Sequence, residues 1–164
     1  MSPLQGGVVL RSATADDLPY LRQLYAGTRE QELAAVPWPP AAKQAFVDQQ
    51  FALQHQHYIR TYVGAEFLVV LCGGTPVGRY YLWHSEADFL IIDISLDPGM
   101  RGRGVGSALI GQTQSMAAER GCGVRLNVRR DNEAARRLYL RLGFLPGTCE
   151  EDDAYLPMRW IPLS

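Results

Sequence analysis

The stretch between residues 88 and 129 constrains the fold of this chain more than any other. Residues 88–96, DFLIIDISL, form the most apolar run and are typical of a buried strand. The glycine-rich stretch RGRGVGS at 101–107 follows, and it leads into a helix-like segment over 105–120. Residues 123–129, GVRLNVR, then read as another strand. A strand, a helix and a strand in this order predict a parallel crossover, and hence a mixed α/β fold.

The residues before this crossover predict a first strand, two helices and a hairpin. The first strand is expected at 8–11, and the first helix begins with Thr14 as its N-cap. A second helix is expected from 41 to about 58. Strands at 66–71 and 77–83 flank the turn residues CGGTP, which predict a hairpin with a longer loop.

The residues after the crossover predict one more helix and two strands. Asn132 is expected to cap the helix EAARRLYLRL, which Gly143 closes. The tail FLPGT to AYLPMRWI suggests two strands around an acidic turn. A length of 164 residues suits one ordinary domain, so we interpret residues 1–164 as a single domain.

Composition argues against several classes of partner. The net charge of −1 gives no general reason to expect nucleic acid or an anionic membrane. No apolar run approaches the roughly 20 residues that span a bilayer, and the N-terminus lacks the pattern of a signal peptide. The three cysteines share no CxxC spacing, and His55 and His57 do not share a helix face. We therefore expect a cytoplasmic protein without a metal.

The glycine-rich stretch has the composition of a phosphate-binding turn at a helix start. It is not a Walker P-loop, because that motif needs a lysine and none lies here. It also departs from the dinucleotide fingerprint, whose third glycine would fall on Ser107, and this disfavours a nucleotide-binding α/β protein. Glycine-rich turns are also common where no ligand binds, so the stretch taken alone leaves that alternative open.

The surrounding sequence resembles the GCN5-related N-acetyltransferase (GNAT) family. Written as Arg101-x-x-Gly104-x-Gly106, the stretch matches the family signature, within the run LDPGMRGRGVGSALI. The run LNVRRDNEAARRLYLRLGF resembles the second conserved block of the family, in which an Asn caps a helix before Leu-Gly-Phe. Together the two blocks cover residues 89–144.

The resemblance implies the acyl-CoA N-acyltransferase fold and acetyl-CoA as co-substrate. In that fold a central, twisted, mixed sheet is flanked by about four helices. Strands 88–96 and 123–129 splay apart, and the pantetheine arm of the cofactor inserts between them. The positions that match cofactor-binding residues of the family are Ile94, Ser95, Leu96, Arg101, Gly102, Arg103, Gly104, Val105, Gly106, Ser107, Asn127, Asn132, Ala135 and Tyr139.

Tyr139 and Asp93 are the candidate catalytic residues. Tyr139 matches the family tyrosine near the CoA sulfur, and its phenol is protonated at neutral pH, so it can serve as general acid. The alternative is a core aromatic. Asp93 interrupts an apolar strand, and it could deprotonate the amine through a water, anchor the amine, or be structural. Alternation groups Asp93 with Ile91 and Ser95 unless a bulge intervenes. Asn127 occupies the position of a glutamate base in some relatives, and it cannot be a base.

The sequence predicts an amine acceptor, either a small molecule or a peptide, without identifying it. By the resemblance, the acidic run at 150–153 borders the acceptor entrance together with Glu30 and Glu32. These carboxylates would favour cationic amines, although such a run is also typical of a solvated hairpin tip. A homodimer stays open. The alternative function is a catalytically inactive acetyl-CoA-binding module that acts as a sensor or partner protein.

Overall fold

The chain folds into one seven-stranded sheet with helices on both faces. The structure is a computed structural model that describes residues 7–85 and 87–163. The strands follow the spatial order β1-β2-β3-β4-β5-β7-β6. They are β1 Val8–Ser12, β2 Glu66–Cys72, β3 Thr75–His84, β4 Asp88–Leu96, β5 Gly123–Arg129, β6 Leu145–Pro146 and β7 Tyr155–Trp160. The helices are α1 Leu18–Ala34, α2 Pro40–Thr61, α3 Val105–Glu119 and α4 Glu133–Arg141.

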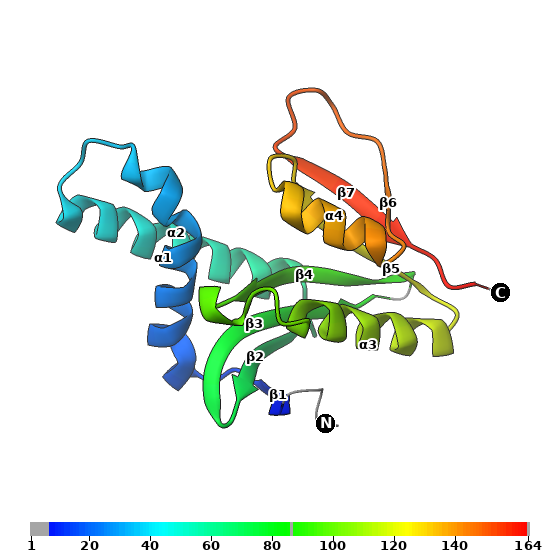
Figure 1. Cartoon of the computed structure of the whole chain (residues 1–164). Helices are drawn as coiled ribbons and strands as arrows, with labels where there is room; N and C mark the ends of the chain where they lie inside the picture. Colours follow the sequence, from blue (N-terminus) through cyan, green and yellow to red (C-terminus); the bar gives the residue numbers. More distant parts are fainter. Residues whose placement is uncertain (1–6, 86, 164) are drawn as a thin grey trace.

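The sheet is mixed, as the sequence predicts. β4 and β5 pair in parallel, and the other neighbouring strands pair antiparallel. The helix α3 connects β4 to β5, and Figure 1 shows it packed along the front of the sheet while α2 crosses behind. The mixed α/β fold, the crossover and the four flanking helices are therefore confirmed.

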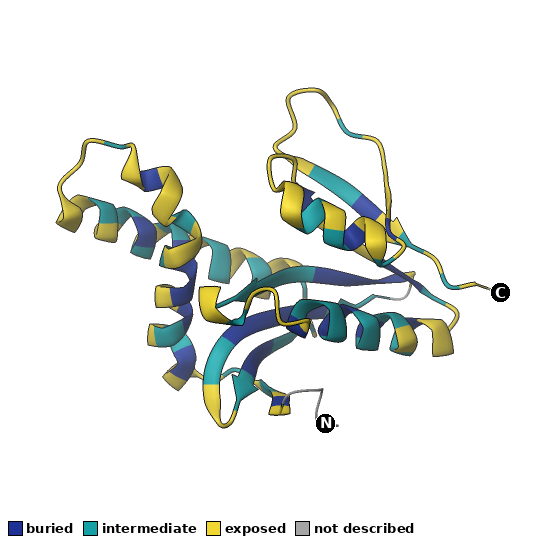
Figure 2. Cartoon of the chain, in the orientation of Figure 1, coloured by how far each residue is buried: buried dark blue, intermediate teal, exposed yellow. Residues whose placement is uncertain are grey.

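Two hydrophobic clusters hold the layers together. The main core joins one face of the sheet to α3 and α4 through residues such as Ile91, Leu109 and Tyr139. A second cluster joins α1 to α2 through Leu21 and Phe51. Figure 2 shows the buried residues running along the central strands, whereas α4 and the loop before β7 are largely exposed. The core therefore follows the central strands, and the exposed residues lie on the outer side of α4 and in the loop before β7.

Most element boundaries lie close to the predicted ones, with two differences at the N-terminal side. A short 3₁₀ turn over Ala15–Asp17 precedes α1, and the Asp17 carboxylate accepts a hydrogen bond of 2.7 Å from the Thr14 backbone N–H. The hairpin between β2 and β3 has a two-residue turn, so the expected longer loop is wrong. Gly73 and Gly74 both have positive φ, +59° and +82°, which suits a tight turn and lets Thr75 join the strand.

β4 changes its environment halfway along its length. Its first half pairs with β5, from Asp88 opposite Gly123 to Ile91 opposite Leu126. Beyond Ile91 the two strands are no longer paired, which is the splay that the resemblance implies. We call residues 88–91 the closed half of β4 and residues 92–96 the open half.

A β-bulge at the start of the open half overturns one sequence prediction. Tyr81 pairs with Asp93 while its neighbour Leu82 pairs with Ile91, so Ile92 is an extra residue. Ile91 and Ile94 therefore both pack on the main core, and Asp93 lies with Ser95 on the opposite face. The simple alternation that grouped Asp93 with Ile91 is wrong, because the bulge shifts the pattern by one residue.

Candidate functional site

The glycine-rich loop presents a row of unused hydrogen-bond donors at the start of α3. None of the six backbone N–H groups from Gly102 to Ser107 donates to another residue in the described part of the chain. Gly102 and Gly104 have φ of +74° and +79°, and Gly104 is the N-cap of the helix. Left-handed backbone explains both glycines, because a Cβ at either position would meet no atom within 4 Å.

The two arginine side chains of the loop are not neutralised by a neighbouring carboxylate among the described residues, so their positive charges can act on a ligand. Arg101 and Arg103 are exposed and form no ion pair within residues 7–85 and 87–163. The positive end of the α3 dipole adds to these two charges. Val105 is buried in the main core and fixes the helix start, and Gly106 lies close to the Ile94 and Leu138 side chains. The loop is thus a cationic, donor-rich surface of the kind that binds phosphate groups.

The helix α4 holds Tyr139 in the main core, and its neighbour Leu138 lies close to Gly106 of this loop. Asn132 caps the helix, as the sequence predicts, and its Oδ1 accepts from the Ala135 backbone N–H at 3.1 Å. Ala135 packs partly buried against the main core, and the Tyr139 ring lies against Phe144. Burial, together with the negative charge of Asp93, raises the pKa of Tyr139 to about 12. The phenol therefore stays protonated across neutral pH and can donate a proton.

The open half of β4 carries the other predicted residues. Ile94 and Leu96 pack against the main core, whereas Asp93 and Ser95 lie on the opposite face of the sheet. The Ser95 hydroxyl donates to Asp93 Oδ1 at 2.8 Å. Asp93 also forms an ion pair with Arg79 of β3, whose Nη2 lies 2.6 Å from Asp93 Oδ2. This contact favours anchoring or structural roles for Asp93 over that of an unpaired base.

Sequence reasoning missed Arg79. Its side chain is only 3% exposed, and its Nη2 also donates to the Gln54 Oε1 of α2 at 2.9 Å. The guanidinium lies 4.9 Å from the centre of the Tyr81 ring. Its Nε is buried and has no hydrogen-bond partner. An arginine in the run VGRYYLW, between apolar neighbours, was the available signal, because a buried arginine requires a carboxylate partner nearby.

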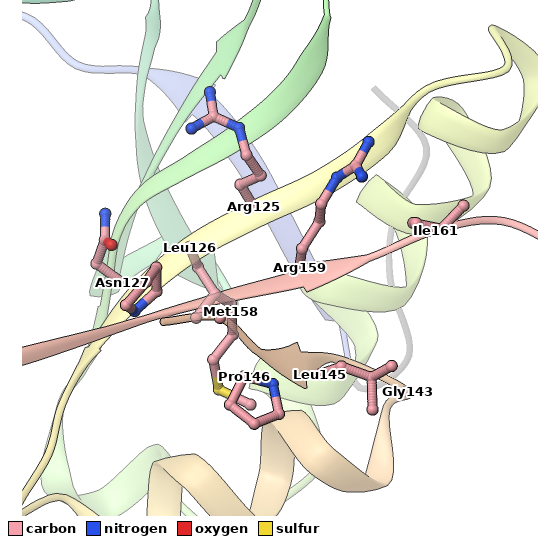
Figure 3. Close-up of a pocket in the computed structure, with 11 residues that line it drawn as sticks. Arg125, Leu126, Asn127, Gly143, Leu145, Pro146, Met158, Arg159 and Ile161 are labelled. Atoms are coloured by element: carbon pink, nitrogen blue, oxygen red, sulfur yellow. The ribbon is translucent and has the colours of Figure 1, made fainter. Parts of the chain in front are cut away.

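Asn127 lies on β5 beyond the point where this strand leaves β4. It is exposed and lines a cavity of about 450 Å³ over β5, β6 and β7 (Figure 3). Figure 3 shows Arg125 and Arg159 next to each other on neighbouring strands at the same cavity, and the two residues are paired in the sheet register. Leu126 and Val128 point into the core, so Asn127 shares the sheet face of Asp93. Tyr139 does not line this cavity.

A second cavity of about 830 Å³ lies between α1, the start of α2 and the end of β4. Glu30, Lys43 and Arg101 contribute charges to its lining, and the Tyr20 hydroxyl donates to Asp97 at 3.2 Å. Burial and the nearby Asp97 raise the pKa of Tyr20. Arg101 is thus shared between this cavity and the glycine-rich loop, whereas Asp93 belongs to neither cavity.

The acidic run at 150–153 is a compact turn built around Arg130. Arg130 Nη1 donates to the carbonyl oxygens of Glu150, Glu151 and Asp153. The Asp153 carboxylate accepts from the Glu150 backbone N–H at 2.8 Å. The side chains at 151 and 152 form no hydrogen bond or ion pair with another described residue. On α1, Glu32 is close enough to Arg129 for that charge to contribute to its lowered pKa, after the hydrogen bond from Arg29.

No helix in the described part of the chain is both long and apolar enough to cross a bilayer. Within the same residues, no three histidine, cysteine or acidic side chains gather where they could hold a metal ion.

Comparison with known proteins gives a consistent picture. The model of the acetyltransferase (GNAT) family matches residues 21–144. The N-alpha-acetyltransferase RimI of Mycobacterium tuberculosis is 37% identical over 108 residues, which are 66% of this chain and 61% of that protein. The match therefore spans less than two thirds of that relative's length.

Solved structures show the same fold at low sequence identity. The PaiA N-acetyltransferase of Thermoplasma acidophilum, in complex with coenzyme A, superposes with a TM-score of 0.70. It is 16% identical, and the match covers 94% of this chain and 99% of that one. The ribosomal-protein-S18-alanine N-acetyltransferase of Escherichia coli has a TM-score of 0.61 at 21% identity, with 96% of each chain covered.

Proposed function

This chain belongs to the acetyltransferase (GNAT) family, and from that premise we propose that it transfers the acetyl group of acetyl-CoA to an amine. The observation that carries the proposal is the row of six unused N–H donors at Gly102–Ser107, next to the open half of β4. A turn of this kind suits a pyrophosphate, because its donors and the helix dipole point at the same region. Arg101 and Arg103 would add charge-assisted contacts.

The open half of β4 suits the amide-bearing arm of the same molecule. Its residues from 92 to 96 have no partner on the β5 side, so backbone groups on that edge can pair with an extended ligand. Ile94, Ser95 and Leu96 would carry these contacts, and Asn132, Ala135 and Tyr139 would close the site from α4. An extended ligand that pairs with the backbone of a strand edge needs few specific side chains to bind it.

Acetyl-CoA supplies an acetyl group activated as a thioester, and the protein contributes to the transfer through three kinds of group. A backbone N–H near Leu96 would polarise the thioester carbonyl. The Tyr139 hydroxyl would donate its proton to the departing thiolate, and its raised pKa keeps that proton in place before transfer. An amine that arrives protonated would release one proton to solvent before it attacks, and the second proton, lost as the C–N bond forms, would replace the one that Tyr139 gives to the thiolate. Asp93 is the carboxylate on this part of the sheet that could orient the amine.

The acceptor is proposed as an amine whose identity is open. The M. tuberculosis relative is named an N-alpha-acetyltransferase, so the α-amine of a peptide is the first class to test. Small-molecule amines form the second class. The acidic turn at 150–153 and Glu32 support a preference for cationic acceptors, because both contribute negative charge near the β5–α4 connection. A cytoplasmic location and a homodimer remain predictions.

Two measurements test the function. Calorimetry with acetyl-CoA, CoA and NAD should show binding of the two CoA compounds and none of NAD. Thiol release should then be followed with a panel of peptides, polyamines and small amines. Binding of acetyl-CoA without acetyl transfer to any acceptor would indicate the alternative, a CoA-binding module without catalysis. Absence of acetyl-CoA binding would contradict both.

A further inference from the structure

We propose that Arg79 is a positioning residue that holds Asp93 in place as the anchor of the acceptor amine. The inference rests on the proposed function and extends it to a residue outside the family motifs quoted above. Its basis is a network across three elements. Gln54 comes from α2, Arg79 from β3, and Asp93 and Ser95 from the open half of β4.

The network binds both oxygens of the Asp93 carboxylate. Arg79 approaches Asp93 Oδ2 at 2.6 Å, and the Ser95 hydroxyl approaches Oδ1 at 2.8 Å. The arginine side chain is 3% exposed, whereas that of Asp93 is 16% exposed. The cation therefore lies deeper than the anion, and the carboxylate is the part of the pair that reaches accessible space. A carboxylate offers about four lone-pair sites, so capacity remains for a donor from outside.

Asp93 lies on the α2 side of the sheet, just beyond the point where β4 and β5 separate. Its charge contributes to the raised pKa of Tyr139 on α4, after burial. It contributes in the same way to the raised pKa of Tyr58 on α2, again after burial. The helices α4 and α2 cover opposite faces of the sheet, so Asp93 is close enough to residues on both faces for its charge to influence them. The bulge at Ile92 gives Asp93 this position.

No other carboxylate lies on the unpaired ends of the two splayed strands. Residues 92–96 of β4 and 127–129 of β5 contain Asp93 as their one acidic side chain, and Asn127 is neutral. Amines mostly arrive protonated, so an ionised carboxylate is the group that can bind them before they react. A buried ion pair contributes little net stability compared with apolar packing. Placing one at this opening is therefore better explained by orienting a ligand than by stabilising the fold.

The test is the variant R79Q, assayed with the best acceptor from the panel. Without Arg79, Asp93 Oδ2 loses its buried partner and the carboxylate is free to turn. We expect the KM of the amine to rise about tenfold or more, as for the loss of one charge-assisted hydrogen bond. The Kd of acetyl-CoA should stay within about twofold. R79K should recover part of the amine KM, because lysine restores the charge without the planar geometry.

The matched control is R159Q, which removes an arginine from a carboxylate at the other end of the same strand. Arg159 Nε lies 2.8 Å from Asp88 Oδ2 in the closed half of β4. We expect R159Q to lower thermal stability and leave the amine KM unchanged. If R79Q does not fold, S95A removes only the second support of Asp93, and its amine KM should rise by a smaller factor.

The outcomes separate this inference from the proposed function. A wild-type protein that neither binds acetyl-CoA nor acetylates any amine would contradict the function itself. An active wild type whose folded R79Q variant keeps the wild-type amine KM would overturn the role of Arg79 alone. An equal rise of the amine KM in R159Q would also overturn it, because the effect would then follow general loss of stability.

Discussion

The two halves of β4 differ in what surrounds them, since one end of the strand is built into the sheet and the other carries the candidate site. In the closed half, all four residues are buried and paired with β5. The Asp88 carboxylate there accepts from the Gly123 backbone N–H at 3.0 Å and from Arg159 Nε at 2.8 Å. In the open half, residues 92–96 are only partly buried and lack a partner on the β5 side. The Asp88 carboxylate is buried and bonded within the protein, whereas the Asp93 carboxylate is 16% exposed and can still bind a ligand.

Two glycines beside the two halves of β4 are required for different reasons. A Cβ at Gly123, beside the closed half, would lie 2.6 Å from the Trp160 carbonyl oxygen, so this glycine is required for space. A Cβ at Gly104, beside the open half, would meet nothing within 4 Å, so this glycine is required for its φ of +79°. Close packing therefore defines the closed end, and an unusual backbone that leaves donors free defines the open end. Variants at the two ends should separate stability from function.

The largest expected effect is that of Tyr139→Phe on the rate. The change keeps the ring in the core and removes the proton that a general acid would donate, a role typically worth about 10²–10⁴ in kcat. Stability and acetyl-CoA binding should change little. Because the pKa of Tyr139 is raised to about 12, the wild-type rate should not fall through its deprotonation below about pH 10.

Steady-state kinetics and thermal unfolding check this prediction, with Tyr25→Phe as control. Tyr25 is also buried, and its hydroxyl accepts from Arg29 at 2.7 Å, away from β4. A kcat of Tyr139→Phe within a few-fold of wild type would make Tyr139 a core residue without a chemical role.

The next effect is that of Gly104→Asp on acetyl-CoA affinity. A side chain at this position strains the left-handed backbone and adds a negative charge where the donors converge. We expect the affinity to fall about a hundredfold or more, by the loss of several charge-assisted contacts. Calorimetry measures the change directly.

The control for that variant is Gly64→Asp. Gly64 has a φ of +83° and open space around it, so it carries the same backbone strain at a distant turn. If both variants bind acetyl-CoA as tightly as the wild type, the glycine-rich loop is not the pyrophosphate site.

A third, smaller effect concerns the closed half, where Asp88→Asn should reduce stability without changing the chemistry. The variant removes the charge that accepts from Arg159 and Gly123, and we expect a loss of about 1–3 kcal/mol in the free energy of unfolding. The hydrogen bond from Arg159 outweighs burial and lowers the pKa of Asp88. Its contribution is therefore complete above the unfolded pKa of about 4 and is lost as the pH falls further.

Urea unfolding at several pH values tests this, since the deficit of Asp88→Asn should shrink in acid. Asp131→Asn is the control, because its ion pair with Arg129 is exposed and should contribute no measurable stability. A deficit that persists unchanged at acidic pH would show that the charge of Asp88 is not what stabilises the closed half.

The smallest effect is expected from the acidic turn, with the double change Glu151→Gln and Asp152→Asn. If these side chains attract cationic acceptors, their loss should raise the amine KM about two- to fivefold at low salt and flatten its salt dependence. Glu119→Gln, an exposed change at the far end of α3, is the control. An unaffected KM for both cationic and zwitterionic amines would identify the turn as a solvated tip.

The sequence predicts the backbone-made part of this molecule far better than its side-chain network. The crossover, the Asn132 cap and the glycine-rich loop are local, because a turn or a cap depends on residues a few positions apart. The bulge at Ile92 arises from pairing with β3, so a strand read alone gave Asp93 the wrong neighbours. The partners of Arg79 lie 14 and 25 residues away in the chain, beyond the reach of any local pattern.

The turn around Arg130 makes the charge at its tip separable from the folding of its backbone. Arg130 binds three carbonyl oxygens of the turn, and carbonyls are present whatever side chains the turn carries. Positions 151 and 152 can therefore change without altering the course of the backbone. Selection, or a protein engineer, can exchange charges at these two positions one at a time while the sheet and the glycine-rich loop stay as they are. Arg130 fixes the backbone of the turn, so the charges of its side chains can vary without changing its shape.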